Sequence, residues 1–537
     1  MMKPETPAAT DPSATSKAHG IGMYRWVICA LLFLATTINY MDRSVFGVLG
    51  PTLQYKVFNW SDTDYANINI AFKFAYAIGL LGMGAVIDKL GTKIGYTLAI
   101  GIWSIFGMLH AAVRPAFGLL GFCLARFGLG LGESGNFPAA IKTVGEWFPK
   151  KERALATGIF NGGSNVGAIL APLVIPLIVW PDGTNWQFAF LTTGVFSGLW
   201  VLLWWKVYQR PEMHPRLSPA ELTYINSDSV AETSKEKVPW SKVLPLRETW
   251  AFATVKITDA VWWFYLFWGG KFLYDRFGLD IKGVALPLII IYLLADVGSI
   301  AGGWLSSFFI KRGWAVNRAR KTTLLLCAIF IMPVTLVTQL GTRFNVNDRF
   351  FKELQTIRFT TERTVTVDGK VKREKVEEGV PAETQAALHA LSGKSYESAK
   401  EFLTAVTSVI PTGQAKRMES AFIRCARSDK LYWIAVLLMA MATGGHQAWS
   451  ANVFTLASDV FPKKATASVT GIGGMVGAVA GMLADWRLGK ILTSSGPSGY
   501  FFAFLIAGMA YLVLLGIAHL LMPHMTPLDE NLRHVEA

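Results

Sequence analysis

Phe148-Pro-Lys-Lys-Glu-Arg-Ala-Leu-Ala-Thr-Gly158 returns later in the chain as Phe461-Pro-Lys-Lys-Ala-Thr-Ala-Ser-Val-Thr-Gly471. Seven of the eleven positions are identical, and the two copies lie 313 residues apart. Each copy follows one long apolar run and opens the next one. The chain therefore consists of two related halves, and repeated halves of this kind are typical of polytopic membrane proteins.

The composition supports a membrane protein. Only 16% of the 537 residues are charged and the mean hydropathy is +0.36, whereas a soluble chain carries about 25% charged residues. The net charge of +14 does not indicate nucleic-acid binding, because the basic residues lie in short loops between apolar runs, where they orient membrane helices. The four cysteines are scattered, so we expect no disulfide framework, no metal site and no cofactor.

The apolar runs predict an all-α membrane protein, because a membrane helix needs about 20 mostly apolar residues. We expect twelve spans in two six-helix bundles, near residues 25–50, 65–87, 94–113, 116–140, 155–179, 187–207, 250–274, 284–309, 322–341, 431–455, 466–491 and 500–522.

Lys and Arg gather in alternate loops, which predicts that both termini are cytoplasmic. The predicted domains are a disordered cytoplasmic tail (1–23), an N-terminal bundle (24–207), a cytoplasmic linker (208–249), a C-terminal bundle (250–341 and 430–522), an insert (342–429) and a second cytoplasmic tail (523–537).

The insert follows from a second, weaker repeat. Gly79 and Gly84 match Gly298 and Gly303 at an offset of 219 residues, so about 90 extra residues must lie before Phe461. Residues 342–429 are polar and fit this length. They fall outside the cytoplasm in the predicted orientation, as a small α+β unit between the ninth and tenth helices. We expect a hairpin turning at Asp368-Gly369 and helices over 382–391, 395–409 and 413–427. The unit is either a substrate-capture or partner domain or, by preference, a decorated loop.

A loop motif resembles a known family. Gly84-Ala-Val-Ile-Asp88-Lys89-Leu-Gly91-Thr-Lys93 is similar to the loop signature of the major facilitator superfamily, although Ser307 replaces the Asp in the second half. The resemblance implies the twelve-helix major facilitator fold, with these residues in gating.

Four further segments resemble the anion:cation symporters of that superfamily, and among them the hexuronate (glucuronate/galacturonate) transporters. They are Ile38-Asn-Tyr-Met-Asp-Arg43, Ala125-Arg-Phe-Gly-Leu-Gly-Leu-Gly-Glu133, Asp259-Ala-Val-Trp-Trp-Phe-Tyr-Leu-Phe-Trp268 with Lys271, and His446-Gln-Ala-Trp-Ser-Ala-Asn452. The resemblance covers nearly the whole chain except the tails and the insert.

Among the charged residues inside predicted spans, four lie in the first two of these symporter-like segments. A charge at membrane depth costs at least about 2.5 kcal/mol and must pair or face an aqueous cavity. Asp42 and Arg43 lie in the first span, while Arg126 and Glu133 share one face of the fourth. An arginine can hold a carboxylate with two hydrogen bonds, and its withdrawal from Glu133 would favour proton uptake. The alternative is that the four charges pair only to hold the bundle together. The resemblance implies proton coupling by Asp42 and Glu133 and substrate contact by Arg43.

Other polar and aromatic side chains are candidate substrate contacts, since hydroxyl and amide groups bind sugar hydroxyls and aromatic rings stack on pyranoses. For the polar ones in the second and fifth spans, helix packing is an equal alternative. The candidate substrate-binding residues are Tyr40, Arg43, Tyr76, Arg126, Asn161, Ser164, Asn165, Trp263, Lys271, Gln447 and Asn452. Asp485, Arg487 and Lys490 form a charge cluster without an assigned role, and Lys73 has no evident partner.

Together these features predict a bacterial inner-membrane transporter that imports a small organic anion, such as a hexuronate or related sugar acid, with protons. We expect it to act as a monomer in the lipid bilayer. A drug/proton antiporter and a non-transporting sensor remain alternatives, and the paired arginines favour an anion. Enzymatic function is not expected: Gly130-Leu-Gly132-Glu-Ser-Gly135 lies in a helix rather than after a strand, and there is no P-loop.

Overall fold

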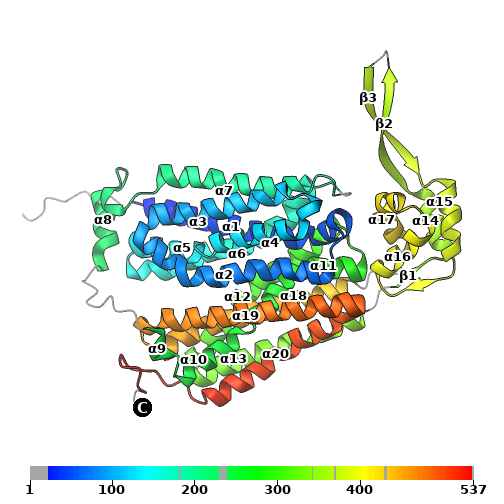
Figure 1. Ribbon diagram of the computed structural model, residues 1–537. Helices are drawn as coiled ribbons and strands as arrows, with labels where there is room; N and C mark the ends of the chain where they lie inside the picture. Colours follow the sequence, from blue (N-terminus) through cyan, green and yellow to red (C-terminus); the bar gives the residue numbers. More distant parts are fainter. Residues whose placement is uncertain are drawn as a thin grey trace, which may run out of the picture.

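The computed structural model describes residues 22–180, 183–228, 239–340, 343–367, 370–427 and 432–534. Two helical bundles lie side by side, and a small α+β unit, the insert, projects from one end of them (Figure 1). We call this the insert end of the bundles and the opposite end, next to α8 (Pro219–Ile225), the linker end.

The first bundle contains the helices before the linker. They are α1 (Tyr24–Pro51), continued by the π-helix η1 (Thr52–Phe58), α2 (Asp62–Leu90), α3 (Thr92–Leu109), α4 (Gly118–Glu133), α5 (Asn136–Trp147), α6 (Lys150–Ile178) and α7 (Gln187–Val207).

The second bundle lies on both sides of the insert in sequence. Its helices are α10 (Arg247–Lys256), α11 (Asp259–Phe277), α12 (Ala285–Lys311), α13 (Val316–Ile331), α18 (Tyr432–Val460), α19 (Lys463–Ser495) and α20 (Tyr500–Leu521).

The repeat is visible in how helices start and pack. Pro149 and Pro462 occupy the position before α6 and α19, with nearly identical extended backbone angles. Proline suits this position because a helix start leaves its N–H groups unpaired. The α2–α4 pair of the first bundle corresponds to the α12–α18 pair of the second, and both pairs pack extensively.

Nine helical stretches among the described residues are long and apolar enough to cross a membrane. They include ten of the twelve predicted spans, because α19 and α20 form one continuous apolar stretch. The two predicted spans outside this set, 250–274 and 431–455, correspond to α10–α11 and α18. Lys256, Asp259 and Lys271 make the first more polar, and His446 and Gln447 do the same for the second. The count of twelve stays a prediction.

Two predicted spans are broken in the structure. The fourth ends at Glu133, and α5 starts after a turn at Ser134 and Gly135. The seventh is divided at Ile257 and Thr258 between α10 and α11. Glycine weakens a helix interior, and such breaks occur at membrane depth only where protein buries the backbone.

The insert has its own hydrophobic core, built on Phe344, Phe350, Phe402, Val406 and Phe422. Strands β2 (Arg358–Val367) and β3 (Lys370–Gly379) pair antiparallel, from Arg358 with Gly379 to Val367 with Lys370. They match the predicted hairpin, whose turn at Asp368-Gly369 lies outside the described residues.

The predicted helices of the insert are also present as α15 (Ala382–Leu388), α16 (Ala399–Val409) and α17 (Thr412–Ala426). The helix α14 (Asp348–Thr356) and the short strand pair β1 (Phe344–Asn345) with β4 (Ser395–Tyr396) were not predicted. A 3-10 turn (His389–Leu391) continues α15, so only the start of the helix predicted from residue 395 is wrong.

Among the described residues, the two bundles meet most extensively through three helix pairs, which are α1 with α11, α2 with α19 and α6 with α12. In the repeat, α2 corresponds to α12 and α6 to α19. The α2–α19 pair is therefore the counterpart of the α12–α6 pair. The bundles are therefore related by a pseudo-two-fold arrangement, as in repeat-built transporters.

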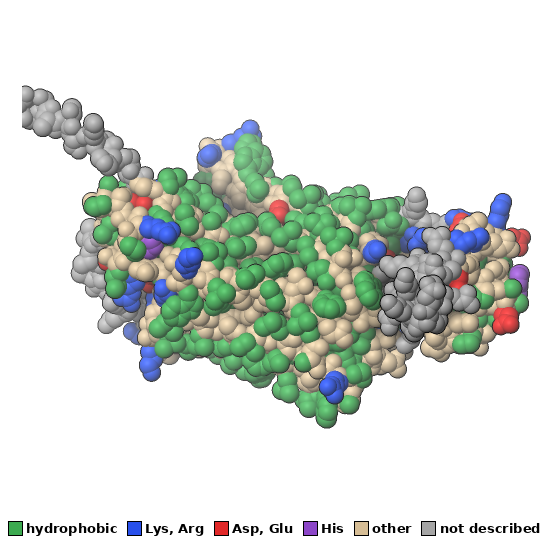
Figure 2. Space-filling view, turned by 90° about the horizontal axis from the view of Figure 1, so that it is seen from above, with side chains coloured by type: hydrophobic (Ala, Val, Ile, Leu, Met, Phe, Trp, Pro, Cys, Tyr) green, Lys and Arg blue, Asp and Glu red, His purple; other side chains and the backbone are tan. Residues whose placement is uncertain are grey.

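Apolar side chains cover the outside of both bundles. Figure 2 shows a broad hydrophobic band along the helical body, whereas most Lys, Arg, Asp and Glu side chains in this view gather toward its two ends. Leu177, Ile300 and Leu520 each have more than three quarters of their surface exposed. Such a band is far larger than the apolar patches of soluble proteins and fits contact with lipid.

Candidate functional site

A buried ion pair joins the first and fourth helices. The Arg43 guanidinium of α1 binds the Glu133 carboxylate at the end of α4, with Nη2 and Nε at 2.8 and 2.9 Å from the same oxygen, Oε2. Both side chains are almost fully buried. Glu133 thus pairs with Arg43, while Arg126 on its own helix stays apart from it.

Arg126 is the unusual charge of the site. Its side chain is completely buried, and none of its three guanidinium nitrogens has a hydrogen-bond partner among the described residues. It lies 4.6 to 5.2 Å from the ring centres of Phe46, Phe72 and Phe267. Cation–π contacts stabilise a cation only by about 2 kcal/mol when desolvated, which does not offset the cost of an unpaired buried charge. Arg126 is therefore a candidate for binding an anion.

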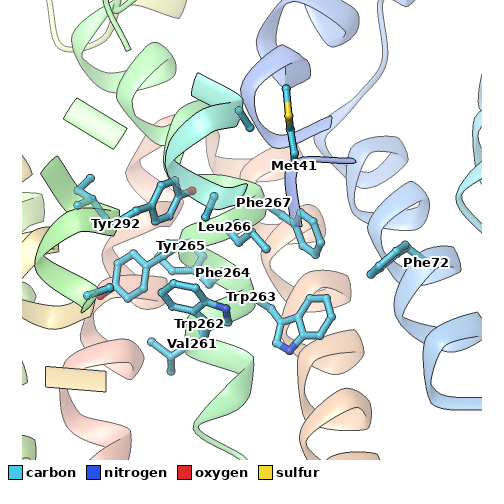
Figure 3. Packing of buried hydrophobic residues seen from close by; sticks show 14 of the residues in the cluster. Met41, Phe72, Val261, Trp262, Trp263, Phe264, Tyr265, Leu266, Phe267 and Tyr292 are labelled. Atoms are coloured by element: carbon cyan, nitrogen blue, oxygen red, sulfur yellow. The ribbon is translucent and has the colours of Figure 1, made fainter. Parts of the chain in front are cut away.

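Aromatic rings connect the two arginines across the bundles. Trp263 and Phe267 of α11 point toward Phe72 of α2 (Figure 3), with ring centres 5.9 Å from it in both cases. The Arg43 guanidinium lies 5.1 Å from the Trp263 ring. Since α2 belongs to one bundle and α11 to the other, the cluster lies where the bundles meet.

Three predicted substrate contacts belong to this cluster. The Arg43 guanidinium lies 4.7 Å from the Tyr40 ring and 4.9 Å from the Tyr76 ring, and the Tyr76 and Trp263 rings are 5.9 Å apart. The structure thus brings Tyr40, Tyr76 and Trp263 together around Arg43, as the prediction of one site requires.

Asp42 faces a different direction from Arg43. It is buried, and its Oδ2 accepts a hydrogen bond of 2.9 Å from Ser197 of α7, while Oδ1 has no partner among the described residues. Adjacent helix positions point about 100° apart, so Asp42 reaches α7 and Arg43 reaches α4. Asp42 is therefore held by hydroxyl contact and not by a cation.

The polar residues of α6 have mixed surroundings. Ser164 donates to the carbonyl of Asn161, one turn earlier, at 2.7 Å. Asn161 is exposed, and Asn165 faces Asp296 of α12 in the other bundle. Asn161 is thus accessible to a ligand, Asn165 interacts with Asp296 of the other bundle, and the Ser164 hydroxyl is already bonded.

The polar residues of α18 differ from one another as well. Gln447 is half-buried. Asn452 donates to the carbonyls of Gly302 and Ala448 at 2.9 Å each, so its amide serves the packing of α12 against α18. His446 binds the Tyr511 hydroxyl of α20 at 2.7 Å, so its ring joins α18 to α20.

Lys271 belongs to a second polar network, at the insert end. It is completely buried and pairs with Asp62 of α2 at 2.8 Å and with Asp275 of its own helix. Tyr55 of η1 donates to Asp275 at 2.8 Å. These contacts join the two bundles and do not include the central arginines. The structure thus places Lys271 in a closure between bundles rather than beside Arg43 and Arg126.

Lys73 and Asp485, which had no assigned role, bind each other. The Lys73 ammonium of α2 lies 2.6 Å from Asp485 Oδ2 of α19. Asp485 Oδ1 also accepts a hydrogen bond of 3.0 Å from the Trp268 indole. The sequence could not predict this pair, because its members are 412 positions apart on helices of different bundles.

The loop motif lies at the linker end. Asp88 pairs with Lys142 of α5 at 3.0 Å, Lys89 is exposed, and Gly91 has a positive φ of 79° that favours glycine. The Lys93 ammonium lies 5.1 Å from the Trp205 ring. Nothing lies within 4 Å of a Cβ built at Gly84, so that position has space for movement.

Four site residues escaped the sequence prediction: Phe46, Phe72, Phe267 and Ser197. Phe72 with Tyr76, and Trp263 with Phe267, have the i, i+4 spacing that places rings on one helix face. That spacing was the available signal. It does not show which face meets the other bundle.

The two-bundle fold with its buried, unpaired arginine is that of a multi-pass membrane transporter. The chain belongs to the Major Facilitator Superfamily, whose family model matches residues 32–344. The match ends where the insert begins, and the predicted superfamily is confirmed.

Two relatives within the superfamily are named as transporters of sugar acids. The chain is 34% identical to the galacturonate transporter of Dickeya chrysanthemi over 53% of this chain and 83% of that protein. It is 33% identical to the hexuronate transporter of Escherichia coli (strain K12) over 57% of this chain and 71% of that protein. These relatives agree with the predicted resemblance and with a transporter rather than an enzyme.

A solved structure supports the fold. A bacterial homologue of the human lysosomal transporter Spinster, in an inward-facing and occupied conformation, aligns with a TM-score of 0.61 at 15% identity. The alignment covers 94% of this chain and 98% of that one. At this identity the likeness shows the fold alone.

Proposed function

We propose that this protein imports a hexuronate or closely related sugar acid together with protons, by alternating access of its two bundles. The observation that carries the proposal is Arg126, which is completely buried and has no hydrogen-bond partner among the described residues. A carboxylate is the anion that matches a guanidinium with two parallel hydrogen bonds. The names of the relatives at 33 and 34% identity support the sugar-acid class.

The surroundings of Arg43, which shares the aromatic cluster with Arg126, suit a sugar ring. Trp263, Tyr40 and Tyr76 offer aromatic faces and two hydroxyl groups beside Arg43. A drug/proton antiporter that binds apolar cations would not need two arginines at its site, so this alternative is disfavoured. Gln447 and the exposed Asn161 are the further candidates for hydroxyl contacts.

Proton coupling is assigned to Glu133 and Asp42. Glu133 accepts both of its contacts from Arg43 through one oxygen, and Oε1 has no partner among the described residues. A substrate carboxylate that attracts Arg43 would weaken this pair and favour protonation of Glu133. Substrate and proton would then bind with mutual reinforcement.

The sidedness follows from the basic loops. We propose twelve spans in a bacterial inner membrane, with both termini cytoplasmic and the insert outside the cytoplasm. The contacts of Lys271 with Asp62, and of Lys73 with Asp485, close the bundles toward the insert end. This arrangement supports an inward-facing state, and the transporter is proposed to act as a monomer.

Counterflow tests the proposal directly. The purified chain is placed in liposomes loaded with unlabelled galacturonate, and entry of labelled galacturonate or glucuronate is measured, with glucose as the neutral control. We expect exchange of the two uronates and none of glucose. An imposed inside-alkaline pH gradient should then drive accumulation. Exchange of glucose, or no exchange of any sugar acid in a panel that includes aldonates and aldarates, would overturn the substrate class.

A further inference from the structure

The Lys73–Asp485 ion pair is a buried charged contact between the bundles. Both side chains are nearly fully buried, with 1% and 3% of their surface exposed. The Lys73 ammonium also contacts the carbonyl of Gly481 at 3.2 Å. The pair therefore joins α2 of one bundle to α19 of the other through several groups.

This pair adjoins the proposed substrate site. The Lys73 ammonium lies 5.6 Å from the Trp263 ring and 5.5 Å from the Phe267 ring. Trp263 is shared with Arg43, and Phe267 is shared with Arg126. Lys73 is thus the third cation on one aromatic cluster.

Opening of the bundles toward the insert end must break the pair. In alternating access the bundles move as nearly rigid bodies about the central site. Further toward the insert end on the same two helices, the Thr63 and Thr493 hydroxyls lie 2.9 Å apart, and Tyr65 of α2 donates to the Phe267 carbonyl of α11 at 2.5 Å. Separation of these contacts carries Lys73 away from Asp485. Asp485 remains on α19 with the Trp268 indole as its other hydrogen-bond donor.

An isolated buried carboxylate is strongly unfavourable, and such a group takes up a proton. The charged and titratable groups facing Asp485 are Lys73 and Tyr65 of α2 and Arg126 of α4. Arg487 and Lys490 on its own helix lie beside the Trp486 ring instead. In the open state Lys73 is withdrawn, and Arg126 is engaged by the substrate carboxylate, so neither cation compensates Asp485.

We propose that Asp485 is a further proton-binding residue of the transport cycle. A proton from water at the insert end binds the Asp485 carboxylate when the bundles separate there, and it leaves when Lys73 returns and the pair forms again. The inference rests on the proposed alternating-access transport. Proton binding is thereby linked to the conformation of the bundles as well as to the substrate.

The test measures opening through a buried position. Asn69 of α2 is completely buried near Tyr65, and Asn69→Cys places a thiol there in a full chain whose four native cysteines are replaced by alanine. The protein is reconstituted in liposomes, and the rate of labelling by a membrane-impermeant maleimide is measured as external pH is changed. Ser494 is exposed, so the labelling rate of Ser494→Cys reports how the maleimide reaction itself depends on pH. Each labelling rate of Asn69→Cys is divided by the Ser494→Cys rate at the same pH.

We expect the corrected labelling rate to rise as external pH falls, at up to about tenfold per pH unit for one linked proton. Asp485→Asn should raise the rate at alkaline pH to the level of the parent at acidic pH and flatten the pH dependence. The double variant Lys73→Gln/Asp485→Asn removes both charges. It therefore tests the loss of the Asp485 carboxylate in a protein that has no unpaired lysine at position 73. Asp259→Asn, which disrupts the Lys256–Asp259 pair within one bundle, should keep the parental slope.

An unchanged slope in Asp485→Asn and in the double variant would overturn the proposal and leave the ion pair a structural contact. A parent rate that does not depend on pH would overturn it too. Counterflow on the same liposomes tests the proposed function separately. Failure to exchange any sugar acid would refute the substrate class, whereas the pH dependence of labelling tests the role of Asp485 alone.

Discussion

The two arginines of the site differ in one respect that decides their roles. Arg43 has a carboxylate partner, whereas Arg126 has none among the described residues. Arg126→Met should therefore abolish sugar-acid binding and raise the free energy of unfolding, by at least the roughly 1–4 kcal/mol gained when buried ion pairs are replaced by apolar side chains, because Arg126 has no ion pair to lose. Thermal melting and binding of the purified protein measure the two effects.

Arg43→Met is the matched control for that change. It leaves Glu133 buried without its cation, which costs roughly 3–5 kcal/mol. Its melting temperature should fall where that of Arg126→Met rises. A lower stability in both variants would show that Arg126 has a structural partner and would remove it from the substrate site.

Glu133→Gln separates coupling from binding. Glutamine keeps the shape and a carbonyl acceptor for Arg43 but cannot release a proton, so accumulation driven by a pH gradient should vanish. Counterflow needs no net proton movement and should persist. Both are measured on one protein preparation in liposomes. Retained gradient-driven accumulation would exclude Glu133 from the proton path and leave Asp42 and Asp485 as candidates.

At the scale of elements, the contact of α1 with α11 depends on a glycine. A Cβ built at Gly47 would lie 2.4 Å from the Leu266 carbonyl oxygen, which is closer than any real contact of this kind. Gly47→Val should therefore disfavour closure at the insert end by about 1–3 kcal/mol, or about five- to 150-fold in the conformational equilibrium. The labelling rate of Asn69→Cys measures this shift.

Gly101→Val in α3 provides the comparison, because nothing lies within 4 Å of a Cβ built at Gly101. It should leave the labelling rate within about twofold of the parent, as surface substitutions change stability by less than about 0.5 kcal/mol. Equal rates in the two glycine variants would mean that the α1–α11 contact does not limit opening.

Sequence reasoning predicted the elements better than their partners. The apolar runs predicted the bounds of α7, 187–207, and the start of α20 at residue 500, as the structure has them. Such predictions succeed because lipid requires long apolar helices regardless of tertiary contacts. The repeat predicted that α6 and α19 are equivalent. The break after Glu133 was missed, since hydropathy does not respond to a turn within an apolar run.

Partner choice is where the sequence was least informative. Arg43 and Glu133 were both predicted as site residues, but their direct pairing depends on the position of α1 relative to the end of α4, which the sequence does not show. Lys73 and Asp485 were noted only as unexplained charges. Pairs between bundles depend on the relative position of two rigid units, and no local pattern in either half encodes that position.

At the scale of the whole molecule, the insert touches the first bundle by ion pairs and the second by a hydrogen bond. Glu419 of α17 accepts a hydrogen bond from Tyr274 of α11 and lies 3.5 Å from Lys56 of η1. Lys400 of α16 lies 3.5 Å from Asp62. The bundles keep their own closure without the insert, since Lys271 binds Asp62 at 2.8 Å.

Deletion of residues 342–429, with a short loop joining α13 and its 3-10 continuation to α18, should therefore leave transport largely intact. The repeat is complete without these residues, and the insert has a separate hydrophobic core. The Lys400–Asp62 pair, whose lysine side chain is 40% exposed, contributes about 0.2–1 kcal/mol. Deletion of the insert returns Lys56, the partner of Glu419, to water, so we expect the uptake rate to stay within about fivefold of the parent. The double variant Lys400→Gln/Glu419→Gln distinguishes the loss of ionic contacts from the loss of the unit itself. It should reproduce any change in rate that arises at the insert end. Loss of uptake in a correctly inserted deletion protein, together with normal uptake in the double variant, would show that the insert captures substrate or a partner needed for transport.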